Sequence, residues 1–170
     1  MKIFIFFDNG VSGSIGIINE MGEAKYFKTP VFKQLSYTKK EKFITRINGN
    51  KLFELLEPYS KDEVRVMLER PLNNPKFWTA SLSALRELEA TLIVIEKLGF
   101  KYEYIDSTEW QNKLLPEYYN GKLVEKEVLK EASLGVAKEL FPQIDFTQFK
   151  DGDGILGALY CKQKYGEINV

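Results

Sequence analysis

The 170-residue sequence contains no histidine. This absence excludes serine or cysteine nucleophiles that a histidine activates, histidine general bases and histidine-ligated zinc. If the protein is an enzyme, carboxylates must carry its chemistry. Sites built from carboxylate oxygens favour Mg²⁺ or Mn²⁺ over softer metals.

Cysteine is nearly absent too, since Cys161 is the only one in the sequence. A single cysteine excludes an internal disulfide and is typical of proteins in a reducing compartment. No stretch approaches the roughly 18 uncharged apolar residues of a membrane span. The N-terminal residues also lack the pattern of a secretory signal peptide. We therefore expect a cytoplasmic protein that does not enter the membrane.

An excess of either charge is missing as well, because 24 basic residues balance 24 acidic ones. A neutral chain has no bulk attraction for nucleic acid, so any such binding requires local basic patches. Apolar residues make up 44% of the chain and aromatic residues 14%, which is typical of a globular protein. The length predicts one domain over residues 1–170.

What the sequence does have is a buried strand that ends on an acid. Residues 2–7 form an almost uninterrupted apolar run, followed by Asp8, two glycines and a second apolar run at 14–18. This pattern predicts a central strand, a tight turn and a returning antiparallel strand, with residues 24–28 as a third. A carboxylate at such a point is costly unless it is paired, for example with a metal. A turn-stabilising role for Asp8 is the alternative.

A second strand with an acid at its tip covers residues 63–69 and ends on Glu69. Because it follows a helical segment, we expect it to run parallel to the first strand, which places Glu69 beside Asp8. For a lone glutamate, a surface salt bridge with Arg70 or Lys76 would be the commoner role.

The rest of the chain predicts mainly helices. Residues 82–98 carry leucines at spacings of three and four, a stripe that favours burial against the sheet plus a second contact, such as a dimer partner. The last helix begins with two acids, Asp151 and Asp153, which alone would serve the helix dipole. The other expected elements are a surface connection (31–50), a short helix (51–59), a strand (101–105), a helix capped by Ser107, and a helix over 123–141. This order predicts an α/β protein with a mixed sheet.

Five segments in this order resemble the RuvC-type Holliday junction resolvases of the RNase H-like superfamily, particularly the short bacteriophage forms. The segments are FFDNGVSGSIGII, VMLERP, the long helix after NNPKFW, the pair STEWQNKLL and KEVLKEASLGVAKELFP, and DGDGILGALY. The resemblance implies an RNase H-like fold, with a mixed five-stranded sheet whose first three strands are antiparallel, flanked by helices.

The resemblance also implies a metal site. Asp8, Glu69 and Asp153 match the family's metal ligands. Bacterial members have a further acid three residues before the last one; this chain has Lys150 there, and we expect Asp151 to stand in. The implied cofactor is Mg²⁺, with Mn²⁺ as a substitute and two ions per site, one activating water and one stabilising the leaving oxygen.

Lys113 and Lys130 sit where basic residues of the family contact phosphate. The implied activity is structure-selective cleavage of branched DNA by a homodimer, in DNA recombination or phage DNA processing. Two alternatives stay open at this point: a ribonuclease of the same superfamily, and a non-catalytic junction-binding module. A nucleotide-binding module of the actin type needs two lobes, so we expect no nucleotide cofactor.

Overall fold

The computed structural model describes residues 1–37, 42–71, 75–118 and 125–166. Its central sheet has five strands in the order β3-β2-β1-β6-β7. Strands β1 (Lys2–Phe7), β2 (Ser14–Asn19) and β3 (Ala24–Lys28) are antiparallel neighbours, while β6 (Glu63–Glu69) and β7 (Lys101–Ile105) run parallel to β1. The predicted mixed sheet, including its three antiparallel strands, is confirmed.

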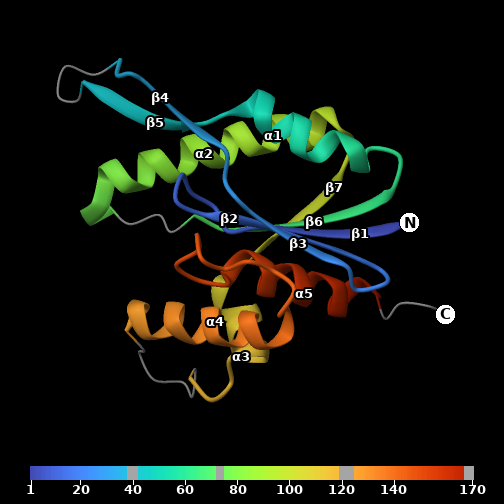
Figure 1. The fold of residues 1–170 in the computed structure, drawn as a ribbon. Coiled ribbons are helices and arrows are strands. Elements are labelled where there is room, and N and C mark those ends of the chain that lie inside the picture. The colour runs from blue at the N-terminus through green and yellow to red at the C-terminus, as the bar shows by residue number, and fades with distance from the viewer. Residues whose placement is uncertain (38–41, 72–74, 119–124, 167–170) are drawn as a thin grey trace.

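Helices cover both faces of this sheet (Figure 1). On one face lie α1 (Gly49–Leu56) and α2 (Trp78–Lys97); on the other lie α3 (Ser107–Leu114), α4 (Lys126–Leu140) and α5 (Asp153–Gly166). Two short 3₁₀ helices, η1 (Glu57–Tyr59) and η2 (Pro75–Phe77), complete the described helices. In the part of the chain that the structure describes, no helix is long and apolar enough to cross a membrane.

The apolar run of β1 serves both layers because successive side chains of a strand point to opposite faces. Phe4 and Phe6 belong to the core beneath α5, whereas Ile3, Ile5 and Phe7 belong to the core beneath α1 and α2. This two-sided burial is why the strand reads as a continuous apolar run rather than an alternating one.

Glycines let α5 approach the sheet at backbone distance. A Cβ placed on Gly16 of β2 would overlap the backbone carbonyl oxygen of Gly154, and a Cβ on Gly157 would overlap the ring of Phe6. The first turn of α5, which carries Asp153, is therefore pressed directly against β2 and β1.

The prediction for residues 31–50 is wrong. Instead of a surface connection, this region holds a hairpin of β4 (Val31–Leu35) and β5 (Phe43–Ile47), a two-stranded sheet separate from the main one. Interspersed lysines obscure the β-forming residues of these strands. The following helix starts at Gly49, earlier than expected, because the side chain of Asn48 accepts the backbone N–H of Lys51 and caps it.

The predicted stripe of α2 is only partly correct. Ile95 is buried, but Leu82 and Leu85 are 42% and 41% exposed. The helix instead turns several polar side chains inward: Ser81, Glu87 and Thr91 are buried. Leucine spacing identified the helix correctly but not its inward face.

The remaining helices agree with the prediction apart from their ends. Residue Asp106, not Ser107, occupies the N-cap of α3, and its backbone N–H donates to Glu109 Oε1 at 3.2 Å. The helix predicted over 123–141 spans Lys126–Leu140 in the structure, and its first expected residues, 123 and 124, lie outside the described ones. Cys161 is buried, as expected of a small apolar residue.

Candidate metal centre

Three aspartates meet where β1 ends and α5 begins. Asp8 directly follows β1, Asp153 is the first residue of α5, and Asp151 lies two residues earlier. Each offers a carboxylate oxygen, and these atoms lie within 4.8 Å of one another. The sheet and the last helix thus bring together acids that are more than 140 positions apart in the sequence.

Glu69 adjoins this cluster without belonging to its tightest part. Because Phe7 of β1 pairs with Leu68 of β6, the two strands deliver Asp8 and Glu69 side by side at the same edge of the sheet. Glu69 Oε2 accepts a hydrogen bond from Trp110 Nε1 at 3.4 Å. The indole of Trp110 is fully buried, so this residue supports Glu69 from the core.

Burial and mutual repulsion raise the pKa of these carboxyl groups. The pKa of Asp8 is well above its ordinary value, first because the group is desolvated and then because Glu69 and the other aspartates lie near. Desolvation and the charge of Asp153 raise the pKa of Glu69 to about 7. Desolvation and the charge of Asp151 raise that of Asp153 to about 6. Carboxylates so placed stay ionised together at neutral pH only when cations offset their charge.

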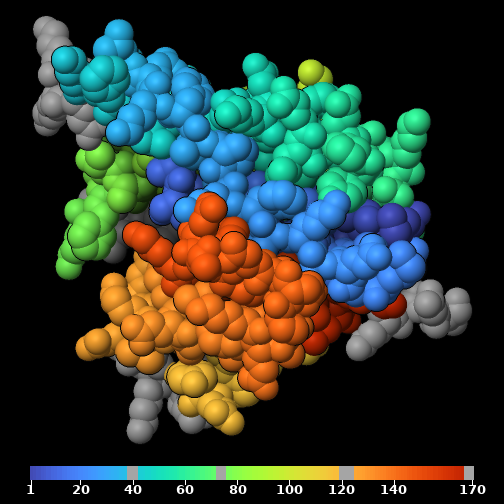
Figure 2. All heavy atoms as spheres, in the orientation of Figure 1, coloured from blue at the N-terminus to red at the C-terminus, as the bar shows by residue number. Residues whose placement is uncertain are grey.

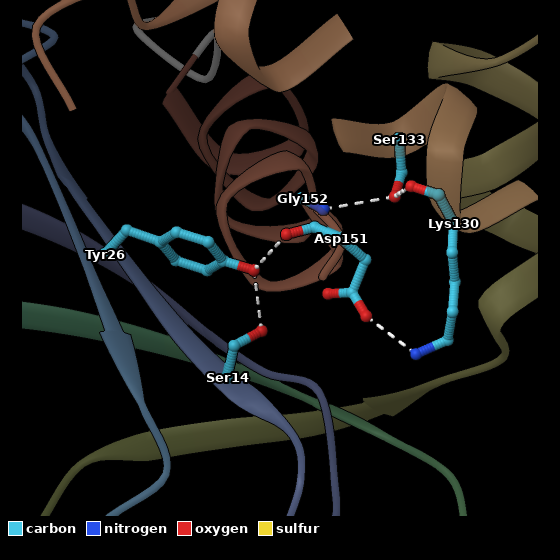
Figure 3. Close-up of polar contacts among 6 residues, drawn as sticks. All are labelled: Ser14, Tyr26, Lys130, Ser133, Asp151 and Gly152. Carbon is cyan, nitrogen blue, oxygen red and sulfur yellow. Dashed lines mark hydrogen bonds and ion pairs between the residues drawn. The ribbon is translucent and has the colours of Figure 1, made fainter. Parts of the chain in front are cut away.

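A lysine side chain supplies positive charge beside these acids. Lys130 of α4 places its Nζ 2.7 Å from Asp151 Oδ2, as Figure 3 shows. Burial alone would lower the pKa of Lys130, but the hydrogen bond to Asp151 and the nearby acids outweigh it and raise the pKa. The ammonium group therefore stays charged beside the acids.

The backbone that carries Asp151 is held from both sides (Figure 3). The Tyr26 hydroxyl lies 2.9 Å from Ser14 Oγ and 3.1 Å from the carbonyl oxygen of Asp151. From α4, Ser133 Oγ accepts the backbone N–H of Gly152 at 3.1 Å. These contacts orient Asp151 toward the cluster. No sequence motif indicated a role for Tyr26 or Ser133.

The turn after Asp8 is anchored to α2 by Glu87. Its Oε2 accepts the backbone N–H of Val11 at 3.0 Å, and its Oε1 accepts the Ser83 hydroxyl at 2.5 Å. Asn9 adds a bond from its side-chain Nδ2 to the Ala84 carbonyl at 3.2 Å. Sequence reasoning missed Glu87 because an acid within a helix usually faces solvent.

Asp151, which we expect to stand in for the acid that Lys150 replaces, is 7% exposed, whereas Lys150 is exposed. Lys130 lies at the site. Lys113 of α3 lies with its Nζ 5.6 Å from the ring centroid of Tyr160. Sequence reasoning missed Lys126, at the start of α4, whose positive charge offsets part of the rise in the pKa of Glu69 and Asp153.

This arrangement can hold a metal ion. The donors are all carboxylate oxygens, the three aspartates converge within one ion's reach, and their repulsion is the condition that a bound cation relieves. Divalent ions with oxygen preference, such as Mg²⁺ or Mn²⁺, fit this donor set.

No protein-family model matches the sequence, and no curated protein matches it either. Among solved structures, Thermus thermophilus RuvC in complex with a Holliday junction substrate matches with a TM-score of 0.58 at 12% identity, over 98% of this chain and 98% of that one. A second Thermus thermophilus RuvC structure matches with a TM-score of 0.50 at 12% identity, over 97% of this chain and 96% of that one. The chain therefore has the RNase H-like fold of RuvC.

Proposed function

We propose that this protein is a metal-dependent endonuclease that cleaves branched DNA, such as Holliday junctions, in DNA recombination or processing. The carrying observation is the cluster of Asp8, Asp151 and Asp153, with Glu69 beside it. The cluster lies where the strands of a RuvC-like sheet end, and the RuvC structure with this fold is bound to a Holliday junction. On this proposal residues 1–170 act as one nuclease domain.

The four acids would hold Mg²⁺, with Mn²⁺ able to replace it, and their number suits two ions. Bound there, the ions supply the Lewis acidity that activates water and stabilises the leaving oxygen of a phosphodiester. The protein itself holds the carboxylates in place. Strands β1 and β6 present Asp8 and Glu69. The segment before α5, which is hydrogen-bonded to Tyr26 and Ser133, presents Asp151.

Two lysines of α4 would attract the DNA strand toward these acids. Lys130 is fixed beside Asp151. Lys126, one turn earlier on α4, offsets part of the rise in the pKa of Glu69 and Asp153. Ammonium groups at the rim of an acidic site reduce its repulsion of phosphate. Lys113 is exposed on α3 and would contact the DNA backbone farther from the reacting phosphate.

The enzyme would act as a homodimer through α2. Trp78, Leu82, Leu85 and Ile93 follow one another at helical spacing, and all are 41% to 64% exposed. Such an unpaired apolar stripe is typical of a contact surface. Two copies related by a twofold axis would present two metal centres to the two strands of a symmetric four-way junction.

The test is incubation of a synthetic four-way junction with the protein and Mg²⁺, with a linear duplex and an RNA–DNA hybrid of matched sequence in parallel. We expect cleavage of the junction only, and its loss in Asp8→Asn and in Glu69→Gln. Junction cleavage that survives either substitution would remove these residues from the mechanism. Preferential cleavage of the hybrid would make the protein a ribonuclease.

A further inference from the structure

The β4–β5 hairpin stands apart from the five-stranded sheet, on the side of the molecule that carries α1 and α2 (Figures 1 and 2). One of its faces is anchored, because β5 packs on α2 and Ile44 is only 8% exposed. The opposite face is buried at Ile47, next to α1, but open at the other end of the hairpin. There Leu35 and Phe43 pair across the two strands, and they are 66% and 52% exposed.

The sequence of this hairpin is mainly basic. Residues 31–47 carry Lys33, Lys39, Lys40, Lys42 and Arg46 against one acid, Glu41, although the whole chain is neutral. Lys42 lies with its Nζ 5.6 Å from the ring centroid of Phe43, so cationic and apolar groups share one surface. Apolar side chains in a segment of net positive charge complement bases and phosphates.

The hairpin is also fixed in position relative to the metal centre. Arg86 of α2 donates from Nη1 to the Tyr37 hydroxyl at 2.9 Å. The next residue, Glu87, accepts the backbone N–H of Val11 in the turn after Asp8. Arg86 and Glu87, adjacent residues of α2, thus hold the hairpin and the turn after Asp8, respectively. DNA bound at the acids and at the hairpin would therefore contact two parts of the protein that the same helix keeps in place.

We propose that the β4–β5 hairpin is a DNA wedge. Leu35 and Phe43 pack on the unstacked bases at a branch point, and Lys33 and Lys42 contact the adjoining phosphates. Apolar wedges of this kind insert where base stacking is already broken, which makes a branch point the least costly place for one. The wedge rests on the proposed function for its substrate and adds the surface that distinguishes branched from linear DNA.

The test measures binding in EDTA, where metal-dependent cleavage does not occur. The probes are a fluorescent four-way junction with 2-aminopurine at the branch point and a linear duplex of the same sequence. For Leu35→Ala/Phe43→Ala we expect a loss of at least about 10-fold in affinity for the junction, with little change for the duplex. We also expect loss of the 2-aminopurine signal that the unaltered protein produces. Met21→Ala, at a 71% exposed position in the β2–β3 turn, is the matched control.

Removing the hairpin's charge should act differently. For Lys33→Gln/Lys42→Gln, both substrates should bind more weakly, and the slope of log Kd against log salt should fall by about one for each phosphate that the variant no longer neutralises. Lys61→Gln/Lys101→Gln removes the same charge at the opposite ends of the parallel strands and should leave the slope unchanged. If the double apolar variant fails to fold, Leu35→Ala alone carries the test, since that side chain is largely exposed.

Junction binding by the apolar variant equal to that of the unaltered protein would overturn the wedge. So would a change of oligomeric state as its only effect, which would make the hairpin an interface between copies. Failure of the proposed nuclease is a separate result. In that case the unaltered protein would not cleave the junction with Mg²⁺, while the hairpin variants would still lose binding.

Discussion

The carboxyl group of Asp8 is half-buried beside Glu69, Asp151 and Asp153; desolvation raises its pKa most, and each of these neighbours raises it further. An acid held in this way lowers the stability of the metal-free protein, which indicates that a function requires it. Substitution at this one residue should therefore change stability and activity in opposite directions.

We predict that Asp8→Asn stabilises the metal-free protein by about 0.5–2 kcal/mol, the usual range for a single stabilising substitution. The amide keeps the shape of the side chain but removes one of the clustered charges. Thermal unfolding in EDTA should show a higher Tm than the unaltered protein, and Mn²⁺ should no longer raise it. Asp145→Asn, at an exposed acid outside the cluster, is the control. An unchanged or lower Tm in EDTA would contradict the argument from repulsion.

The pH dependence of stability should also reflect the burial and mutual repulsion of these acids. The pKa of Asp153 is raised to about 6 and that of Glu69 to about 7, so both groups bind protons more tightly in the folded state than in the unfolded one. Their contribution to stability is therefore fully present below the ordinary carboxyl pKa of about 4 and is lost as pH rises through 6 and 7.

Tm measured in EDTA across this window should fall as pH increases, and saturating Mg²⁺ should flatten the fall because a bound cation replaces the protons. Asp153→Asn/Glu69→Gln should also flatten it without metal. A Tm in EDTA that rises steadily from pH 5 to pH 8 would show that the acids are not close enough to repel one another.

At the scale of elements, the closest contact is that of α5 with β2. A Cβ on Gly16 would overlap the carbonyl oxygen of Gly154, a backbone atom that cannot move without moving the helix start. Asp153 lies on that helix start. A change in how α5 packs on β2 therefore also changes the geometry of the metal centre.

We predict that Gly16→Ala costs about 1–3 kcal/mol or more, as overpacking does, and weakens Mn²⁺ binding even though Gly16 offers no ligand. Gly135→Ala is the matched control: a Cβ at this exposed position of α4 meets nothing within 4 Å. It should stabilise by about 0.5–1 kcal/mol because alanine favours the helix. Chemical denaturation and calorimetric titration with Mn²⁺ would measure both effects. Normal Mn²⁺ affinity in Gly16→Ala would show that the site tolerates displacement of α5.

At the scale of the whole molecule, the exposed stripe of α2 is the surface through which two copies would join. We predict that Leu82→Asp/Leu85→Asp is monomeric by light scattering and keeps its free energy of unfolding within about 0.5 kcal/mol, since both side chains are already exposed. Its junction cleavage should yield single nicks instead of paired ones. Met21→Asp, at a 71% exposed position in the β2–β3 turn, should remain dimeric. A monomeric unaltered protein that still makes paired cuts would exclude this surface.

The sequence by itself determined most of the main sheet and the chemistry available to it. The apolar run before Asp8 and the strand before Glu69 could be read because a strand buried on both faces must be apolar throughout. The absence of histidine left carboxylates as the reactive groups. Where the local pattern was weak, as in the lysine-rich β4–β5 hairpin, the same reasoning failed because pairing between strands, not local preference, stabilises such a hairpin.

Only the tertiary structure decided which groups meet. It showed Asp151 turned inward and paired with Lys130, and Glu87 buried beneath the turn after Asp8. It also showed Trp110 supporting Glu69 from the core, and leucines of α2 left facing outward. These contacts join residues far apart in the chain. Their energies depend on burial and distance, and neither quantity exists until the helices have packed on the sheet.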